Sequence, residues 1–117
     1  MPGMSIHVVD VSRGLVAAGM HVELRSAGDG GFPLILKGEV GSDGLLAHPG
    51  LASVFAVGRY RACFHVGSYY RDSGIAVGEI PFLDVVNYDF GLAAPEQHLH
   101  LPFKCTPWGY SCFRGGA

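Results

Sequence analysis

The stretch HVELR, residues 21–25, alternates polar and apolar side chains, and the stretch YRACFHV, residues 60–66, does the same. Successive side chains of a β-strand point to opposite faces, so a period of two predicts strands that bury one face. The 18 glycines and 7 prolines divide the rest of the chain into segments too short for ordinary helices. These features together favour an all-β fold.

Further strands are expected wherever β-branched or alternating residues lie between turn signals. We predict them at residues 6–11, 34–40, 84–90, 98–103 and 110–113. A tight turn is expected at residues 41–44, where Asp-Gly favours a reversal of the chain. One short helix is expected within residues 68–77. Strands of this length, separated by turns roughly every 8–12 residues, are typical of an antiparallel β-sandwich or small barrel.

The chain of 117 residues is predicted to form a single domain, residues 1–117. Charged residues make up 15% of it and hydrophobic residues 49%. Ordinary soluble domains carry about 25% charged residues, so this shortage of charge predicts a surface partly buried against other subunits.

Charge and segment composition also exclude several kinds of partner. The net charge of −2 argues against a nucleic acid or an anionic membrane, because either would require a basic face. No apolar run approaches the roughly 18 residues of a membrane span, and the first residues do not resemble a signal peptide. We therefore expect a cytoplasmic protein. Cys63, Cys105 and Cys112 lack a C-x-x-C spacing and are expected to be reduced.

Among the six histidines, His98 and His100 are separated by one residue, and this spacing predicts how their side chains lie. Residues i and i+2 of a strand share a face, so the two imidazoles are expected about 7 Å apart on one surface. With a third histidine such as His7, they could bind zinc and leave a fourth position open. They could also act without metal, because a neutral imidazole accepts a proton from water. The pair is equally compatible with a strand whose outer face happens to carry two histidines.

Three blocks of sequence resemble the signatures of a known family. They are IHVVD at residues 6–10 with AAG at 17–19, PEQHLHLP at 95–102, and PWGYS at 107–111 with FRG at 113–115. The chain is thereby similar to the 5-hydroxyisourate hydrolases, which have the transthyretin-like fold. The resemblance implies a sandwich of seven to eight strands with one short helix. It also implies a homotetramer, a dimer of dimers, with active sites in a channel between dimers and with no metal or cofactor.

The resemblance implies a reaction in which water adds across a ring amide and opens the six-membered ring of 5-hydroxyisourate. His7 and His100 match the two active-site histidines of the family, and Arg114 matches an arginine of its C-terminal motif. We expect the histidines to share the role of general base and Arg114 to stabilise the developing oxyanion. His98 matches the first histidine of its block, where a structural role beside the substrate is expected.

Three positions depart from the family pattern. Leu45 replaces an arginine after the Asp-Gly turn, Phe113 replaces a tyrosine, and Gly116 replaces a serine. Together with His98, these residues are expected to contact the substrate, and their apolar or small character predicts an N-methylated, trimethyl 5-hydroxyisourate. The alternatives are an inactive transthyretin-like protein that binds a small ligand, or a zinc-dependent hydrolase that uses the histidine cluster.

Overall fold

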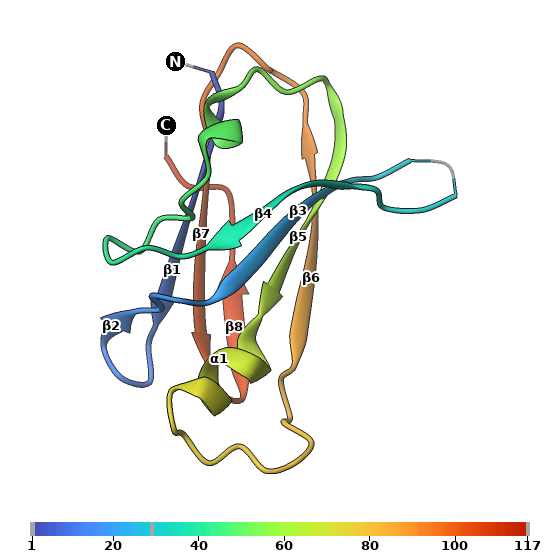
Figure 1. Ribbon diagram of the computed structural model, residues 1–117. Coiled ribbons are helices and arrows are strands. Elements are labelled where there is room, and N and C mark those ends of the chain that lie inside the picture. The colour runs from blue at the N-terminus through green and yellow to red at the C-terminus, as the bar shows by residue number, and fades with distance from the viewer. Residues whose placement is uncertain (1, 29, 117) are drawn as a thin grey trace.

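The computed structural model describes residues 2–28 and 30–116. Its strands are β1 (Met4–Asp10), β2 (Leu15–Val16), β3 (His21–Ser26), β4 (Leu34–Glu39), β5 (Gly58–His65), β6 (Val85–Leu92), β7 (Leu99–Thr106) and β8 (Gly109–Cys112). They form two four-stranded sheets, with strand orders β2-β1-β7-β8 and β4-β3-β5-β6. The two sheets face each other, and the start of β1 lies at the opposite end of the sandwich from helix α1 (Figure 1). The expected all-β sandwich is confirmed.

The helical parts are short. They are the 3-10 helix η1 (Pro49–Ala52) and the α-helix α1 (Val66–Asp72). Helix α1 begins and ends earlier than the predicted range 68–77. It ends at Asp72 because Gly74 takes a φ of +81° just after the C-cap Ser73. No helix within the described ranges is long and apolar enough to cross a membrane. Strand β2 and helix η1 were not predicted, since two and four residues are too few to display a period.

The pairing of β1 with β7 is parallel, whereas the other strand pairs are antiparallel. This pair departs from the wholly antiparallel sandwich that the turn spacing predicted. The register places Ser5 opposite His100 and His7 opposite Pro102. Residues that pair in this way share a face, so the N-terminal strand brings its polar side chains to the face that carries His100.

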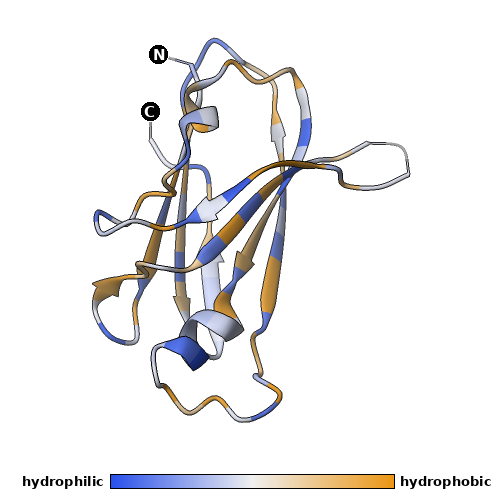
Figure 2. Ribbon diagram, viewed as in Figure 1, coloured by the Kyte–Doolittle hydropathy of each residue, from blue (hydrophilic) through white to orange (hydrophobic). Residues whose placement is uncertain are grey.

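Alternating burial along the strands creates the core between the sheets. Strand β1 shows strict alternation of buried and half-buried residues, and blue and orange alternate along β3 in Figure 2. Phe64 of β5 stacks on Phe103 of β7, with ring centroids 3.8 Å apart and planes 6° from parallel. This stack joins the two sheets at a point where both rings are fully buried.

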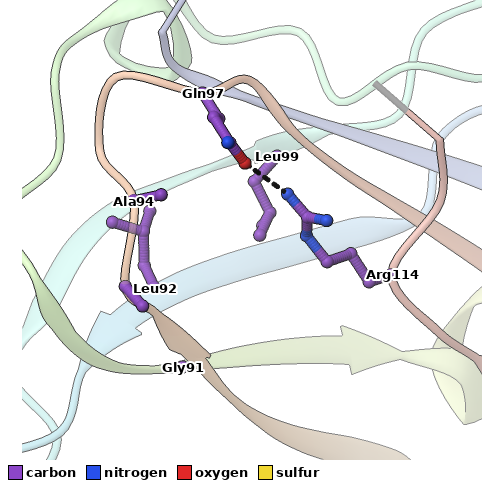
Figure 3. Close-up of a pocket in the computed structure, with 7 residues that line it drawn as sticks. Gly91, Leu92, Ala94, Gln97, Leu99 and Arg114 are labelled. Carbon is purple, nitrogen blue, oxygen red and sulfur yellow. Dashed lines mark hydrogen bonds between the residues drawn. The ribbon is translucent and has the colours of Figure 1, made fainter.

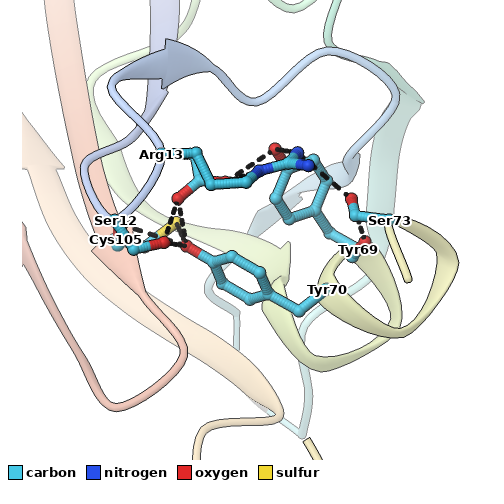
Figure 4. A network of polar contacts seen from close by, with 7 residues as sticks. Ser12, Arg13, Tyr69, Tyr70, Ser73 and Cys105 are labelled. Atoms are coloured by element: carbon cyan, nitrogen blue, oxygen red, sulfur yellow. Dashed lines mark hydrogen bonds and ion pairs between the residues drawn. The ribbon is translucent and has the colours of Figure 1, made fainter. Parts of the chain in front are cut away.

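Asp10, at the end of β1, is the one charged side chain among the described residues that is fully buried. Its carboxylate accepts hydrogen bonds from Ser12 Oγ at 2.6 Å, Tyr70 Oη at 2.7 Å, Arg13 Nε at 2.9 Å and Tyr69 Oη at 3.0 Å. Figure 4 shows this network between the end of β1 and helix α1. The four donors compensate the carboxylate for lost water, and thereby fasten α1 to the sheet.

Candidate active site

The outer face of the β1–β7 pair carries the two histidines that the sequence singled out. His7 lies on β1 and His100 on β7, both half-buried at positions that alternate with core residues. Because Ser5 pairs with His100 and His7 follows two residues later, the three side chains project from the same face. The structure therefore brings His7 and His100 together, although they lie 93 positions apart along the chain.

Leu45 lies directly beside His7. The segment after the Asp-Gly turn runs antiparallel to β1, with Val8 N donating to Gly44 O at 2.9 Å and Leu46 N donating to Ile6 O at 2.9 Å. This places Leu45 opposite His7, where it stays partly exposed. An apolar side chain thus borders the His7 imidazole.

The turn itself supports the His7 ring. Gly44 takes a φ of +85°, which favours glycine, and a Cβ at this position would lie 2.5 Å from His7 Nε2. Asp43 stabilises the turn by accepting a hydrogen bond from Leu45 N at 3.0 Å. The tight turn expected here is confirmed, and its glycine leaves room for the imidazole.

The C-terminal segment passes along His100. Gly115 N donates to His100 O at 2.8 Å, and a Cβ on Gly115 would lie 2.7 Å from His100 Cδ2. Phe113 is 45% exposed, with the Lys104 ammonium 5.7 Å from the centre of its ring. Gly116 is exposed and has open space where a side chain would project. The segment therefore packs backbone, rather than polar side chains, against His100.

Ser5 is a site residue that the sequence reasoning missed. Its hydroxyl lies 2.8 Å from His98 Nε2 and 2.6 Å from His100 Nδ1, so both imidazoles of the H-x-H pair converge on one oxygen. This agrees with the expectation that they share a surface. Ser5 could have been noticed as the residue two positions before His7 on the same strand face, but its contact with β7 depends on the parallel pairing.

The environment of the His100 imidazole favours its neutral form. Burial lowers the pKa of its imidazole below the ordinary value of 6.5, and His7 and His98 lower it further because a charge on either ring would repel a second one. A neutral imidazole at neutral pH has one unprotonated nitrogen and can accept a proton. The arrangement therefore places an imidazole that can accept a proton on this face.

A cavity of about 370 Å³ borders Ser5, Leu45 and His98, whereas His7 and His100 are not among the residues that line it. Ser5, Leu45, His48 and His98 contribute to its walls, and the remaining lining is Pro2, Met4, Ile6, Leu46, Leu51 and Ala52. His48 is half-buried here and accepts a hydrogen bond from Gly50 N through Nδ1 at 2.9 Å. Most of the wall is apolar.

Arg114 occupies a different place from the histidines within the single chain. Its guanidinium donates to Gln97 Oε1 at 3.4 Å and lines a pocket of about 300 Å³ with Leu92, Ala94 and Leu99. Figure 3 shows the side chain extending toward Gln97. The structure therefore joins Arg114 to the H-x-H block through Gln97 and does not bring it to His7.

The cysteines close to this face are buried or half-buried and unreactive. Burial raises the pKa of Cys105 to about 11 and of Cys112 to about 12, so both thiols remain protonated at neutral pH, as expected for small apolar residues. Across residues 2–28 and 30–116, no three His, Cys, Asp or Glu side chains are grouped so that they could hold a metal ion. Ser5 instead occupies one ring nitrogen of each histidine in the H-x-H pair.

The chain is similar to known proteins along nearly its whole length. The model of the HIUase/Transthyretin family matches residues 4–115. A 5-hydroxyisourate hydrolase of Deinococcus radiodurans is 38% identical over 116 residues, covering 97% of this chain and 96% of that protein.

Solved structures with a similar fold include a 5-hydroxyisourate hydrolase and a transthyretin. The 5-hydroxyisourate hydrolase of Klebsiella pneumoniae superposes with a TM-score of 0.81 at 26% identity, covering 99% of this chain and 100% of that one. Sea bream transthyretin, solved in complex with thyroxine, has a TM-score of 0.82 at 23% identity, covering 98% of this chain and 96% of that one, which supports the fold alone.

Proposed function

This chain belongs to the HIUase/Transthyretin family, and we propose that it hydrolyses a 5-hydroxyisourate, with an N-methylated form as its preferred substrate. The observation that carries the proposal is the placement of His7 and His100 on one face of adjacent strands. Burial and neighbouring histidines keep the pKa of His100 low, so this imidazole is available as a base at neutral pH.

The proposed reaction begins when His100 takes a proton from a water molecule, whose oxygen attacks a ring carbonyl carbon. The resulting tetrahedral oxyanion collapses, the ring C–N bond breaks, and the proton passes to the departing nitrogen. His7, on the same face, is proposed to share the handling of this proton. The role of Arg114 in stabilising the oxyanion stays a prediction.

Three features of the site support an N-methylated substrate. Leu45 borders His7, Phe113 lies half-exposed near the C-terminal segment, and Gly116 leaves its space open. The adjacent cavity of about 370 Å³ has mostly apolar walls. N-methylation replaces N–H donors by apolar groups, and each buried methyl-sized group gains about 0.8 kcal/mol in such surroundings. A trimethyl 5-hydroxyisourate therefore suits these walls better than the unmethylated compound.

The proposal predicts a preference between two substrates. With freshly generated 5-hydroxyisourate and its trimethyl analogue, kcat/KM above spontaneous decay is expected to be at least about tenfold higher for the analogue, as about 1.4 kcal/mol of extra contact produces. Faster turnover of the unmethylated compound would overturn the methylation proposal and leave the hydrolase. No acceleration of either compound would overturn the hydrolase and favour the alternative of an inactive binding protein.

A variant at Leu45 sharpens this comparison. Leu45→Arg is expected to shift the preference toward the unmethylated compound by about 5- to 100-fold, because a guanidinium facing methyl groups loses its hydrogen-bond partners. Leu34→Arg is the matched control, since Leu34 is also partly exposed but lies on β4 of the other sheet. An unchanged preference in Leu45→Arg would show that Leu45 does not face the substrate.

We further propose that the protein assembles as a homotetramer, a dimer of dimers. Strands β6 and β8 each pair with only one neighbour among the described residues, and an edge strand presents unpaired N–H and C=O groups that a second copy can bind. Exposed apolar side chains, including Ile80 at 90% and Trp108 at 71%, provide additional surface for burial.

The assembly is tested by sedimentation equilibrium at several protein concentrations. The expected mass is four times the 12.4 kDa of one chain. A mass that stays at one chain throughout would contradict the proposal, and a mass of two chains would restrict it to the dimer. A single domain over residues 1–117 and a cytoplasmic location stay predictions.

A further inference from the structure

The hydroxyl of Ser5 lies between two imidazoles of the proposed active site. Ser5 Oγ is 2.6 Å from His100 Nδ1 and 2.8 Å from His98 Nε2. Both distances are those of good hydrogen bonds. A serine hydroxyl has a single proton, so it can donate only one of these bonds, and the other must be donated by a ring N–H.

Two arrangements of protons satisfy this geometry when both rings are neutral. In the first, His98 Nε2 donates to Ser5, which donates to His100 Nδ1, so His100 carries its proton on Nε2. In the second, His100 Nδ1 donates to Ser5, which donates to His98 Nε2, and His100 Nε2 is unprotonated. The first makes His100 Nε2 a donor and the second makes it a proton acceptor.

We propose that Ser5 is the positioning residue that imposes the second arrangement and so holds His100 Nε2 ready to accept a proton from water. This inference rests on the proposed function, in which His100 is the general base. When Nδ1 donates to Ser5, Nε2 is the unprotonated nitrogen of the neutral ring and can take the proton. A base whose second nitrogen is held by a third group is a recurrent arrangement in hydrolases.

Neighbouring residues also hold the His100 ring so that Nδ1 faces Ser5. The register of β1 and β7 places Ser5 directly opposite His100, and Gly115 packs against Cδ2 of the imidazole. Gly115 N also donates to His100 O at 2.8 Å. After Nε2 takes a proton, the Nδ1–H bond to Ser5 becomes charge-assisted and therefore stronger, which stabilises the imidazolium while the tetrahedral intermediate exists.

The proton positions can be measured without substrate by 15N NMR of protein labelled in its histidines. Near pH 8 imidazoles are mostly neutral, and the chemical shift of each ring nitrogen reports whether it carries the proton. In the unaltered protein we expect His100 Nε2 to be unprotonated. In Ser5→Ala we expect the proton to move to Nε2, because an imidazole in water favours that tautomer.

Kinetics of the same variants provide the second measurement. Ser5→Ala is expected to lower kcat about 10- to 100-fold, a part of the 10²–10⁴-fold contribution of a general base. Ser5→Thr keeps the hydroxyl in a residue that suits strands and is expected to restore both the tautomer and kcat to within about threefold. Ser26→Ala, on β3 of the other sheet, is the matched control and is expected to change neither.

His98→Ala tests the same chain of hydrogen bonds from its other end. It removes the acceptor for the Ser5 proton, so His100 Nε2 is expected to gain proton occupancy even if Ser5→Ala does not fold. An unaltered protein with His100 Nδ1 unprotonated, or a Ser5→Ala variant with an unchanged tautomer, would overturn the inference. The predicted tautomer in a protein that hydrolyses neither substrate would overturn the proposed function and leave the role of Ser5 in placing the proton intact.

Discussion

Replacing His100 with asparagine is expected to lower kcat by about 10²- to 10⁴-fold, the contribution of a positioned general base. Asparagine has a similar size and can still bond to Ser5 through its amide, but it cannot take a proton from water. The measurement is the turnover of the preferred substrate above its spontaneous decay. His21→Asn is the matched control, because His21 is exposed on β3 in the other sheet.

The His7→Asn variant tests whether His7 and His100 both take part in proton transfer. Because His7 shares the face of His100 and borders Leu45, we expect a loss of kcat in this variant as well. If both variants kept full activity, the proposed base would be wrong. A loss confined to His100→Asn would assign the base to that residue alone.

The pH profile provides an independent check on His100. Its pKa is lowered from 6.5 by burial and by the histidines at positions 7 and 98, so the unprotonated form prevails at neutral pH. The kcat/KM of the unaltered protein should therefore rise with pH along a limb centred below 6.5. A limb centred well above pH 7 would contradict this assignment.

Asp10→Asn is expected to destabilise the folded protein by about 3 kcal/mol. The substitution turns an acceptor of four hydrogen bonds into a group with its own donors, facing the hydroxyls of Tyr69 and Tyr70 and the Arg13 guanidinium. The buried hydroxyls of Tyr69 and Tyr70 lose a charged acceptor, which accounts for a loss of this size. Urea unfolding at one fixed protein concentration measures it, because assembly makes the stability concentration-dependent.

The same network makes a prediction about acid. Burial alone would raise the pKa of Asp10, but hydrogen bonds from Ser12, Tyr70, Arg13 and Tyr69 outweigh it, and the pKa lies below 3.8. The carboxylate therefore stabilises the fold fully above the unfolded-state pKa of about 3.9, and this stabilisation is lost as pH falls through the lower folded-state value. The difference in unfolding free energy between the protein and Asp10→Asn should be constant near neutrality and shrink in that acidic range. Asp72→Asn, on the surface of α1, is expected to show neither effect, and equal stabilities of the two variants would contradict the role of the network.

Most strands were predictable because their signal is local. The alternation in residues 21–25 and 60–66 predicted which side chains are buried before any partner strand was known. Strand β3 follows it closely, whereas in β5 Cys63 is buried along with its neighbours. The Asp-Gly turn at 43–44 was equally local. Strand β2, of only two residues, exists through its pairing with β1 and had no pattern of its own.

The candidate site was predictable only in part, because some of its contacts depend on the pairing of distant strands. The resemblance of three sequence blocks to a family pointed to His7 and His100, and the structure places them on one face. Ser5 could not be linked to His100 in advance, because their contact spans 95 positions and requires the parallel register of β1 and β7. Likewise, the side chain of Arg114 turns toward Gln97, a direction that its place in a motif does not specify.

The local order of residues was therefore sufficient to establish an all-β chain, the inward and outward side of each long strand, and the shared face of His98 and His100. These properties follow from the period-two geometry of a single strand. Tertiary pairing was needed to make β1 a neighbour of β7, to enclose Asp10 beneath α1 and to place Ser5 between two imidazoles. Those outcomes depend on packing between distant segments, where the free energy of burying both sheet faces selects which strands become neighbours.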